Sequence, residues 1–182
     1  MTTLYTIIIF SENLAGVLNA VTNTFTRRQI NIESINASTS GTEGIHRYTL
    51  TCYCDDHTID TLVKQLEKKV DVIKAQYFKQ DEIYVREQAL LKIATPKLLE
   101  SPEISKAIRT FDGRMVEVNP TFTIVSQEGT PDEITALYHH IKAADCLLQF
   151  VRSGILAVTM SPREELTEFL DLREIQRQAQ QE

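Results

Sequence analysis

A short polar loop between two apolar segments contains residues whose types and spacing suit ligand binding. The loop is Glu12-Asn13-Leu14-Ala15-Gly16. It leads into an expected helix whose apolar stripe would be Leu14, Leu18, Val21 and Phe25. The first N–H groups of a helix have no partner within it and carry the positive end of its dipole, so they can hold a carboxylate. Gly16 lets a ligand approach the backbone, and Asn13 offers both a donor and an acceptor. The loop could therefore bind a free amino acid, and the alternative is an ordinary helix cap.

Hydrophobic patterning predicts the elements that would position this loop. Residues 4–10 form an apolar, β-branched run that predicts a buried strand before the helix. Further strands are expected at 30–38, 46–54 and 72–78, with a helix between the last two that carries Ile59, Leu62, Val63, Leu66 and Val70. The order β-α-β-β-α-β is the ferredoxin-like arrangement. Because both helices lie on one face of such a sheet, the other face needs cover, and a homodimer made by joining sheets would provide it.

The same order recurs after the charged break Gln80-Asp81-Glu82. Strands are expected at 89–94, 115–118 and 122–125, and helices after Ser101 and after Thr130. Two short strands, 147–151 and 155–158, are expected around Ser153-Gly154. The fold class is therefore α+β, with two tandem ferredoxin-like βαββαβ domains at residues 1–78 and 79–160, followed by a helical or partly disordered tail at 161–182.

Composition indicates a soluble globular protein. The chain has 182 residues, of which 42% are hydrophobic and 24% charged, and its net charge of −6 gives no sign of nucleic-acid binding. No run is long enough to span a membrane, and the N-terminus lacks the basic region of a signal peptide. Of three cysteines, Cys52 and Cys54 point the same way from a strand and are expected to be core thiols. We therefore expect a reduced, cytoplasmic protein.

Catalytic and metal-binding motifs are absent from the sequence. It contains no nucleophile elbow, no glycine-rich phosphate or dinucleotide loop and no H-E-x-x-H. His139 and His140 are adjacent on an expected helix, so they face different directions and cannot chelate one metal ion together. We therefore assign no catalytic residue, no metal ligand and no cofactor to this chain.

The loop and the end of its unit together resemble a known family. Asn-x-x-Gly-Val-Leu opens the helix, and Arg-Arg-x-x-Asn-Ile-Glu-Ser, residues 27–34, closes the unit. This combination resembles the small regulatory subunit of acetolactate synthase, also called acetohydroxyacid synthase, whose N-terminal ACT domain binds amino acids. The resemblance implies an effector site that contains Asn13, Leu14, Ala15, Gly16, Val17, Asn31 and Ile32. One departure is Gln29, which stands where the family usually has glycine.

The resemblance extends over the second domain, to about residue 160. It is carried by Arg86-Glu87, Lys92, Glu117-Val118, Glu128-Gly129-Thr130 and Arg152-Ser153-Gly154. In the family this domain contacts the catalytic large subunit, which implies a partner contact at Arg152, Ser153 and Gly154. The alternative for these three residues is a strand-end turn that carries a surface arginine.

The resemblance implies a non-catalytic regulatory subunit in branched-chain amino-acid biosynthesis. The catalytic large subunit, a thiamine diphosphate-dependent transferase, would carry thiamine diphosphate, FAD and magnesium. Valine is the usual effector of the family, and leucine and isoleucine stay open because a methylene changes affinity in an apolar pocket by only about 1–3 kcal/mol. The chain is expected to pair as a homodimer through its ACT domains. One alternative is a free-standing ACT-domain sensor that regulates a different protein, and another is an enzyme with an unrecognised site.

Overall fold

The computed structural model describes residues 2–161, 166–167 and 169–171. The chain forms two compact units, one of Met1–Tyr84 with Ala157–Glu182, and the other of Val85–Leu156. The first unit thus extends beyond the expected boundary at residue 78, and the chain returns to it from Ala157 onward. Both boundaries between the units fall inside long strands, and the first lies two residues after the charged break at 80–82.

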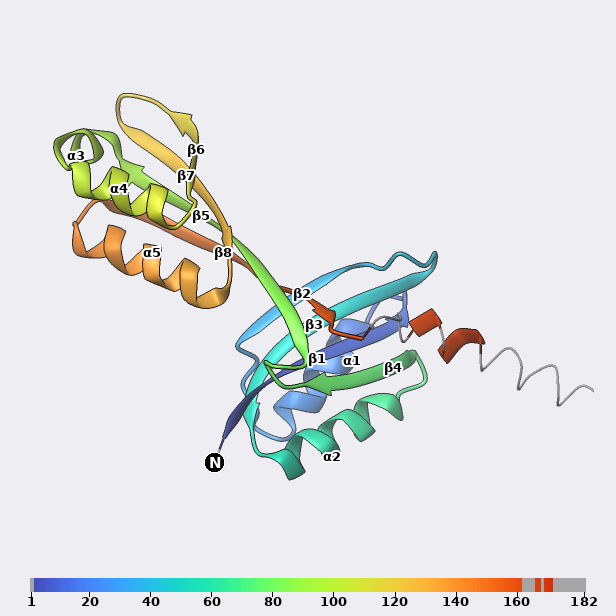
Figure 1. The fold of residues 1–182 in the computed structure, drawn as a ribbon. Coiled ribbons are helices and arrows are strands. Elements are labelled where there is room, and N and C mark those ends of the chain that lie inside the picture. The colour runs from blue at the N-terminus through green and yellow to red at the C-terminus, as the bar shows by residue number, and fades with distance from the viewer. Residues whose placement is uncertain (1, 162–165, 168, 172–182) are drawn as a thin grey trace, which may run out of the picture. The chain divides into compact units, whose positions relative to one another are not determined.

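The first unit is a four-stranded antiparallel sheet with two helices (Figure 1). Its elements are β1 (Thr3–Glu12), α1 (Val17–Thr26), β2 (Ser34–Thr39), β3 (Ile45–Cys54), α2 (Asp56–Glu67) and β4 (Val72–Phe78). The strand order is β2-β3-β1-β4, and β1 pairs with β3 on one side and β4 on the other. This topology confirms the predicted ferredoxin-like order.

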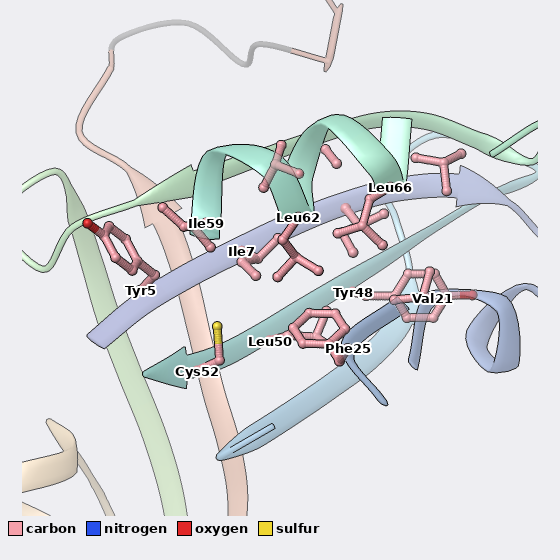
Figure 2. Close-up of a cluster of buried hydrophobic side chains, with 14 of the residues drawn as sticks. Tyr5, Ile7, Val21, Phe25, Tyr48, Leu50, Cys52, Ile59, Leu62 and Leu66 are labelled. Carbon is pink, nitrogen blue, oxygen red and sulfur yellow. The ribbon is translucent and has the colours of Figure 1, made fainter. Parts of the chain in front are cut away.

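Side chains from both helices and one face of the sheet form the first core. Figure 2 shows Ile59, Leu62 and Leu66 from α2 pointing toward the strand residues Ile7 and Leu50. The α1 stripe differs from the predicted one. Its buried residues are Val17, Val21, Thr24 and Phe25, whereas Leu14 lies before the helix and is 54% exposed, and Leu18 is 40% exposed. In α2, the predicted stripe is correct except for Val70, which follows the helix and is exposed.

The opposite face of the same sheet is also covered. Ile8 and Phe10 alternate with the core residues of β1 and are only 4% and 8% exposed. The chain that returns from the second unit contacts this face: Arg47 donates to the carbonyl of Ala157, and Lys74 Nζ lies 5.6 Å from the centre of the Phe169 ring. This part of the face is therefore packed within a single chain, and the expected homodimer through the first units stays a prediction.

The second unit repeats the arrangement with one additional helix. Its elements are β5 (Ile83–Ala94), α3 (Thr95–Glu100), α4 (Pro102–Thr110), β6 (Arg114–Val118), β7 (Phe122–Gly129), α5 (Pro131–Ala143) and β8 (Leu147–Thr159). The strand order is β6-β7-β5-β8. The short helix α3 is absent from the sequence-based prediction. The two expected short strands form one continuous strand, β8. Gly154 lies within this strand with a φ of 75°, so the glycine does not interrupt it.

Helix starts follow the capping rules. Asp55 caps α2 by accepting from Thr58 N. Thr130 and Glu133 form a reciprocal capping box at the start of α5. In the C-terminal segment, residues 166–167 and 169–171 are helical, in accord with the helical part of the expected tail. The rest of the predicted tail lies outside the described residues.

The departure at Gln29 occurs at a turn that favours glycine. Helix α1 ends with Ile30 N bonded to Phe25 O, the six-residue closure of a Schellman motif. The motif places Gln29 in the left-handed region, with φ of 56°. A side chain in this conformation costs about 1–2 kcal/mol, which glycine avoids. The left-handed turn that ends α1 therefore favours glycine at position 29 for a backbone reason.

Replacing Gln29 with glycine should stabilise the protein. We expect Gln29→Gly to raise the free energy of unfolding by about 0.5–1 kcal/mol, because relief of backbone strain exceeds the added entropy of the unfolded chain. Gln29→Ala is the matched control and should give no such gain, since alanine keeps the Cβ. Urea denaturation of the three proteins measures the difference. Equal stabilities for the glycine and alanine variants would contradict the strain at this position.

Candidate functional site

The loop between β1 and α1 is held at its base by both neighbouring turns. Glu12 N donates to Asp71 O, and Asn13 N donates to Gly44 O, each at 2.9 Å. These bonds tie the end of the central strand to the α2–β4 turn and to the β2–β3 hairpin. The base of the loop is therefore fixed by main-chain bonds, while Asn13 to Gly16 lie exposed at the surface.

Gly16 is the residue that turns the chain from this loop into the helix. It is the N-cap of α1, with φ of 92° and ψ of −14°, a conformation that L-amino acids with side chains rarely adopt. No side chain caps the helix, and a Cβ built on Gly16 would meet no atom within 4 Å. Val17 N donates to Leu14 O at 3.5 Å, and Ala20 N donates to Gly16 O at 3.0 Å. The N–H groups of the exposed Leu18 and Asn19 are therefore the ones available to an anion of the size of a carboxylate.

The predicted effector residues divide into two groups. Asn13, Leu14, Ala15 and Gly16 form one exposed stretch, and Asn31 is exposed before β2. The side chain of Val17 is 2% exposed and belongs to the first core, against which Ile32 also packs. Val17 and Ile32 therefore contribute their backbone, and not their side chains, to any site at this surface.

The structure adds Leu18 to the residues beside the loop. Leu14 and Leu18 are exposed leucines at either side of Gly16, off the buried face of α1. Single exposed leucines are common on protein surfaces. Two exposed leucines beside an open helix N-terminus form an apolar surface that the branched aliphatic side chain of a ligand could contact. Sequence analysis assigned both residues to the buried stripe, because four apolar residues at helical spacing do not reveal where the helix begins.

The three predicted partner-contact residues are joined to β5. The Arg152 guanidinium holds the Glu87 carboxylate in two hydrogen bonds, one of which is Nε to Oε1 at 2.8 Å. Ser153 Oγ accepts from Gln88 N at 3.1 Å, and Gly154 has positive φ. The hydrogen bond from Arg152 to Glu87 raises the pKa of the arginine. Because Glu87 is 4% exposed, Arg152 first of all neutralises a buried carboxylate, a role that neither interpretation of the sequence included.

The cysteine side chains offer no reactive group. Cys52, Cys54 and Cys146 are free and buried, which confirms the prediction of core thiols for the first two. Burial raises the pKa of Cys52 to about 12, so its nucleophilic thiolate is scarce at neutral pH. Among the described residues, no three His, Cys, Asp or Glu side chains lie together in a metal-binding group. The helices in the same part of the chain are all too short or too polar to cross a membrane.

The β-α-β-β-α-β fold of the first unit, with an open loop at its first helix, defines an ACT-type regulatory domain that is followed by a second ferredoxin-like domain. Comparisons with known proteins agree. Residues 7–74 match the model of the ACT domain of proteins like the acetohydroxyacid synthase small subunit, and residues 86–161 match the model of the small subunit of acetolactate synthase. The chain belongs to the family of acetolactate synthase small subunits, the regulatory rather than the catalytic subunits.

Individual relatives match along most of their length. The acetolactate synthase small subunit of Haemophilus influenzae is 30% identical over 158 residues, which cover 87% of this chain and 96% of that protein. The small subunit of Bacillus subtilis is 30% identical over 154 residues, covering 84% and 88%. The crystal structure of the Thermotoga maritima small subunit is similar, with a TM-score of 0.79 and 26% identity over 88% of this chain and 99% of that one.

Breaking the Glu87–Arg152 pair should destabilise the second unit. We expect Arg152→Met to lower the free energy of unfolding by about 2–3 kcal/mol, because it leaves a buried carboxylate without its cation. The double variant Glu87→Met, Arg152→Met should recover most of this loss, since two apolar side chains can replace a buried ion pair. Chemical denaturation of each variant measures the change.

The exposed Arg109 provides the control for loss of an arginine from the same unit. Arg109→Met should change stability by no more than about 0.5 kcal/mol. If Arg152→Met lowered the free energy of unfolding no more than Arg109→Met, the Glu87 carboxylate would not depend on Arg152. The result would then favour a role for Arg152 in partner contact alone.

Proposed function

We propose that this chain binds a branched-chain amino acid at the 13–16 loop and thereby controls the catalytic large subunit of acetolactate synthase. The observation that carries this proposal is Gly16, which begins α1 with a positive φ and leaves the first turn uncapped and exposed. In a member of this family, an open helix N-terminus supports feedback inhibition by an end product of branched-chain amino-acid synthesis, with valine as the first candidate.

The groups around the loop fit the three parts of such an effector. The carboxylate is matched by the N–H groups of the first turn of α1 and the positive end of its dipole. Asn13 and the exposed carboxylate of Glu12 can accept from the ammonium group. The aliphatic side chain is matched by Leu14 and Leu18. These contacts distinguish valine from leucine or isoleucine by only about 1–3 kcal/mol per methylene, so competing effectors are expected to bind with related affinities.

The catalytic partner supplies the chemistry in this proposal. Thiamine diphosphate, FAD and magnesium belong to the large subunit, and this chain would activate that subunit and make it sensitive to valine. Both subunits would act together in the cytoplasm. Arg152, Ser153 and Gly154 stay the proposed contact with the partner, held in place by β5 as described above.

A homodimer through the first units would complete the effector site. The outer face of the first sheet is already covered, so the free edge strand β2, whose residues are mostly exposed, is the better surface for pairing. In such a dimer, Asn31 of one copy would face the 13–16 loop of the other. Static light scattering at micromolar concentration should give twice the mass of the 20.7 kDa chain. A stable monomer would contradict the pairing.

The experiment that tests the function is reconstitution. The purified chain is mixed with the large subunit encoded in the same genome, and acetolactate formation is measured with and without valine, leucine and isoleucine. We expect a faster rate on mixing, inhibition by at least one of the three amino acids, and co-elution of the subunits. No change in rate and no co-elution would refute the proposal, and capture of a different dominant partner from cell extract would favour a free-standing sensor.

A pair of substitutions at Gly16 tests the site itself. Asparagine and aspartate have nearly the same shape, and both tolerate positive φ better than other side chains, so Gly16→Asn and Gly16→Asp carry similar backbone strain. Only aspartate adds a negative charge where the effector carboxylate would lie. At about 4 Å the repulsion is about 1 kcal/mol in water and about 4 kcal/mol at an effective dielectric of 20.

We therefore expect Gly16→Asp to bind valine roughly five- to a thousandfold more weakly than Gly16→Asn. Calorimetric titration of the two variants measures the ratio, and their melting temperatures control for folding. Similar melting temperatures with equal valine affinities would remove Gly16 from the effector site.

A further inference from the structure

The end of β1 that leads to the effector loop lies between two cations. Phe10 is paired across the sheet with Arg47 of β3 and with Lys74 of β4. The neighbours Tyr48 and Ala75 point into the first core, so Arg47 and Lys74 point to the opposite face, as Phe10 does. The Arg47 guanidinium lies over the Phe10 ring, with Cζ 5.8 Å from the ring centre. We refer to Arg47, Phe10 and Lys74 together as the clasp.

Both cations of the clasp hold the returning C-terminal part of the chain. Arg47 Nη2 donates to the carbonyl oxygen of Ala157, at the end of β8. The Lys74 ammonium lies 5.6 Å from the centre of the Phe169 ring. Ala157 and Leu166 are 2% and 1% exposed, so the segment is packed there rather than lying loosely on the surface. The clasp is therefore a contact between the strands of the first unit and a segment far away in sequence, 110 residues from Arg47 in the case of Ala157.

The clasp also adjoins the base of the effector loop. Phe10 precedes Glu12 by two residues, and the Glu12 and Asn13 amides are the groups that anchor the loop to neighbouring turns. Ser11, between them, is fully buried. The pairing of β1 with β4 shifts register between Phe10 and Ser11, directly beside the clasp. A change in the path of Glu12 and Asn13 on effector binding would therefore act on a strand position that is already irregular and that adjoins the clasp.

We propose that Arg47 is the positioning residue that couples effector binding at the 13–16 loop to the C-terminal end of β8. This inference rests on the proposed function and names a residue in its regulation. Bound effector changes the contact of Arg47 with Ala157 near the C-terminal end of β8, the same strand that bears Arg152. In such a coupling, the effector shifts the protein between two arrangements that differ in the contact of Arg47 with Ala157. Removing this contact should therefore abolish the effect of the effector on the partner without abolishing effector binding at the loop.

The test separates binding, activation and inhibition in the full chain with its large subunit. Arg47→Met keeps the length of the side chain but removes the charge and the donor to Ala157. We expect it to bind valine within about threefold of wild type and to activate the large subunit normally. The valine concentration for half-inhibition should rise by roughly tenfold or more, or maximal inhibition should be lost. Arg47→Lys should recover part of the inhibition, because lysine keeps a cation over Phe10.

Lys68→Met is the matched control, since Lys68 is exposed at the C-cap of α2 and its loss removes the same charge from the same unit. It should be inhibited like wild type. Should Arg47→Met fail to fold, Arg47→Gln replaces it, because glutamine removes the guanidinium charge while staying polar, and the same loss of inhibition is expected.

The wild-type protein separates failure of the proposed function from failure of the coupling. A wild-type chain that neither binds a branched-chain amino acid nor alters the large subunit refutes the proposed function, and the coupling falls with it. A wild-type chain that does both, together with a folded Arg47→Met variant that valine inhibits at the wild-type concentration, overturns the coupling alone. Parallel loss of valine affinity and inhibition in Arg47→Met would also overturn it, because Arg47 would then support binding rather than communication.

Discussion

The positive φ at Gly16 is the constraint on which the effector loop depends. β1 is an inner strand of the first sheet, paired with β3 on one side and β4 on the other. The chain must leave this strand and enter α1 within four residues. Only a residue without a side chain makes that turn at no steric cost. The same turn leaves the first N–H groups of α1 uncapped, so the geometry that closes the fold also opens a place for an anion.

Burial of β1 on both faces connects this local turn to the rest of the first unit. Its inner face packs against both helices, and its outer face is covered by the chain that returns along β8. A sheet covered on both faces leaves its edges as the surfaces for association, which favours pairing at β2 over stacking of sheets. It also places the exposed loop directly after the buried Ser11, so a change in the loop acts on a packed strand.

Much of the fold was predictable because each strand and helix carries its own periodicity. The β-α-β-β-α-β order of the first unit follows from alternation in β3 and from the stripe of α2. The start of α1 was not predictable, since Leu14 and Leu18 match the helical spacing although neither is buried. The sign of φ at Gly16 cannot be deduced from composition, because glycine adopts both signs with equal ease.

Long-range contacts account for most of what sequence patterns missed. Glu87 and Arg152 are 65 residues apart, and no local pattern signals that one neutralises the other. Gly154 suggested a turn between two strands, but positive φ at one glycine fits within a continuous strand. Arg47 and Ala157 are brought together only by the return of the chain to the first unit.

The most direct test of the central claim is two-dimensional NMR of the ¹⁵N-labelled chain during titration with valine. Binding at the open end of α1 predicts saturable shifts that are largest for the backbone amides of residues 13–18 and smaller in the second unit. Saturable shifts that leave these amides unchanged and gather elsewhere would contradict the site. No response to valine, leucine or isoleucine at millimolar concentration would contradict effector binding by this chain altogether.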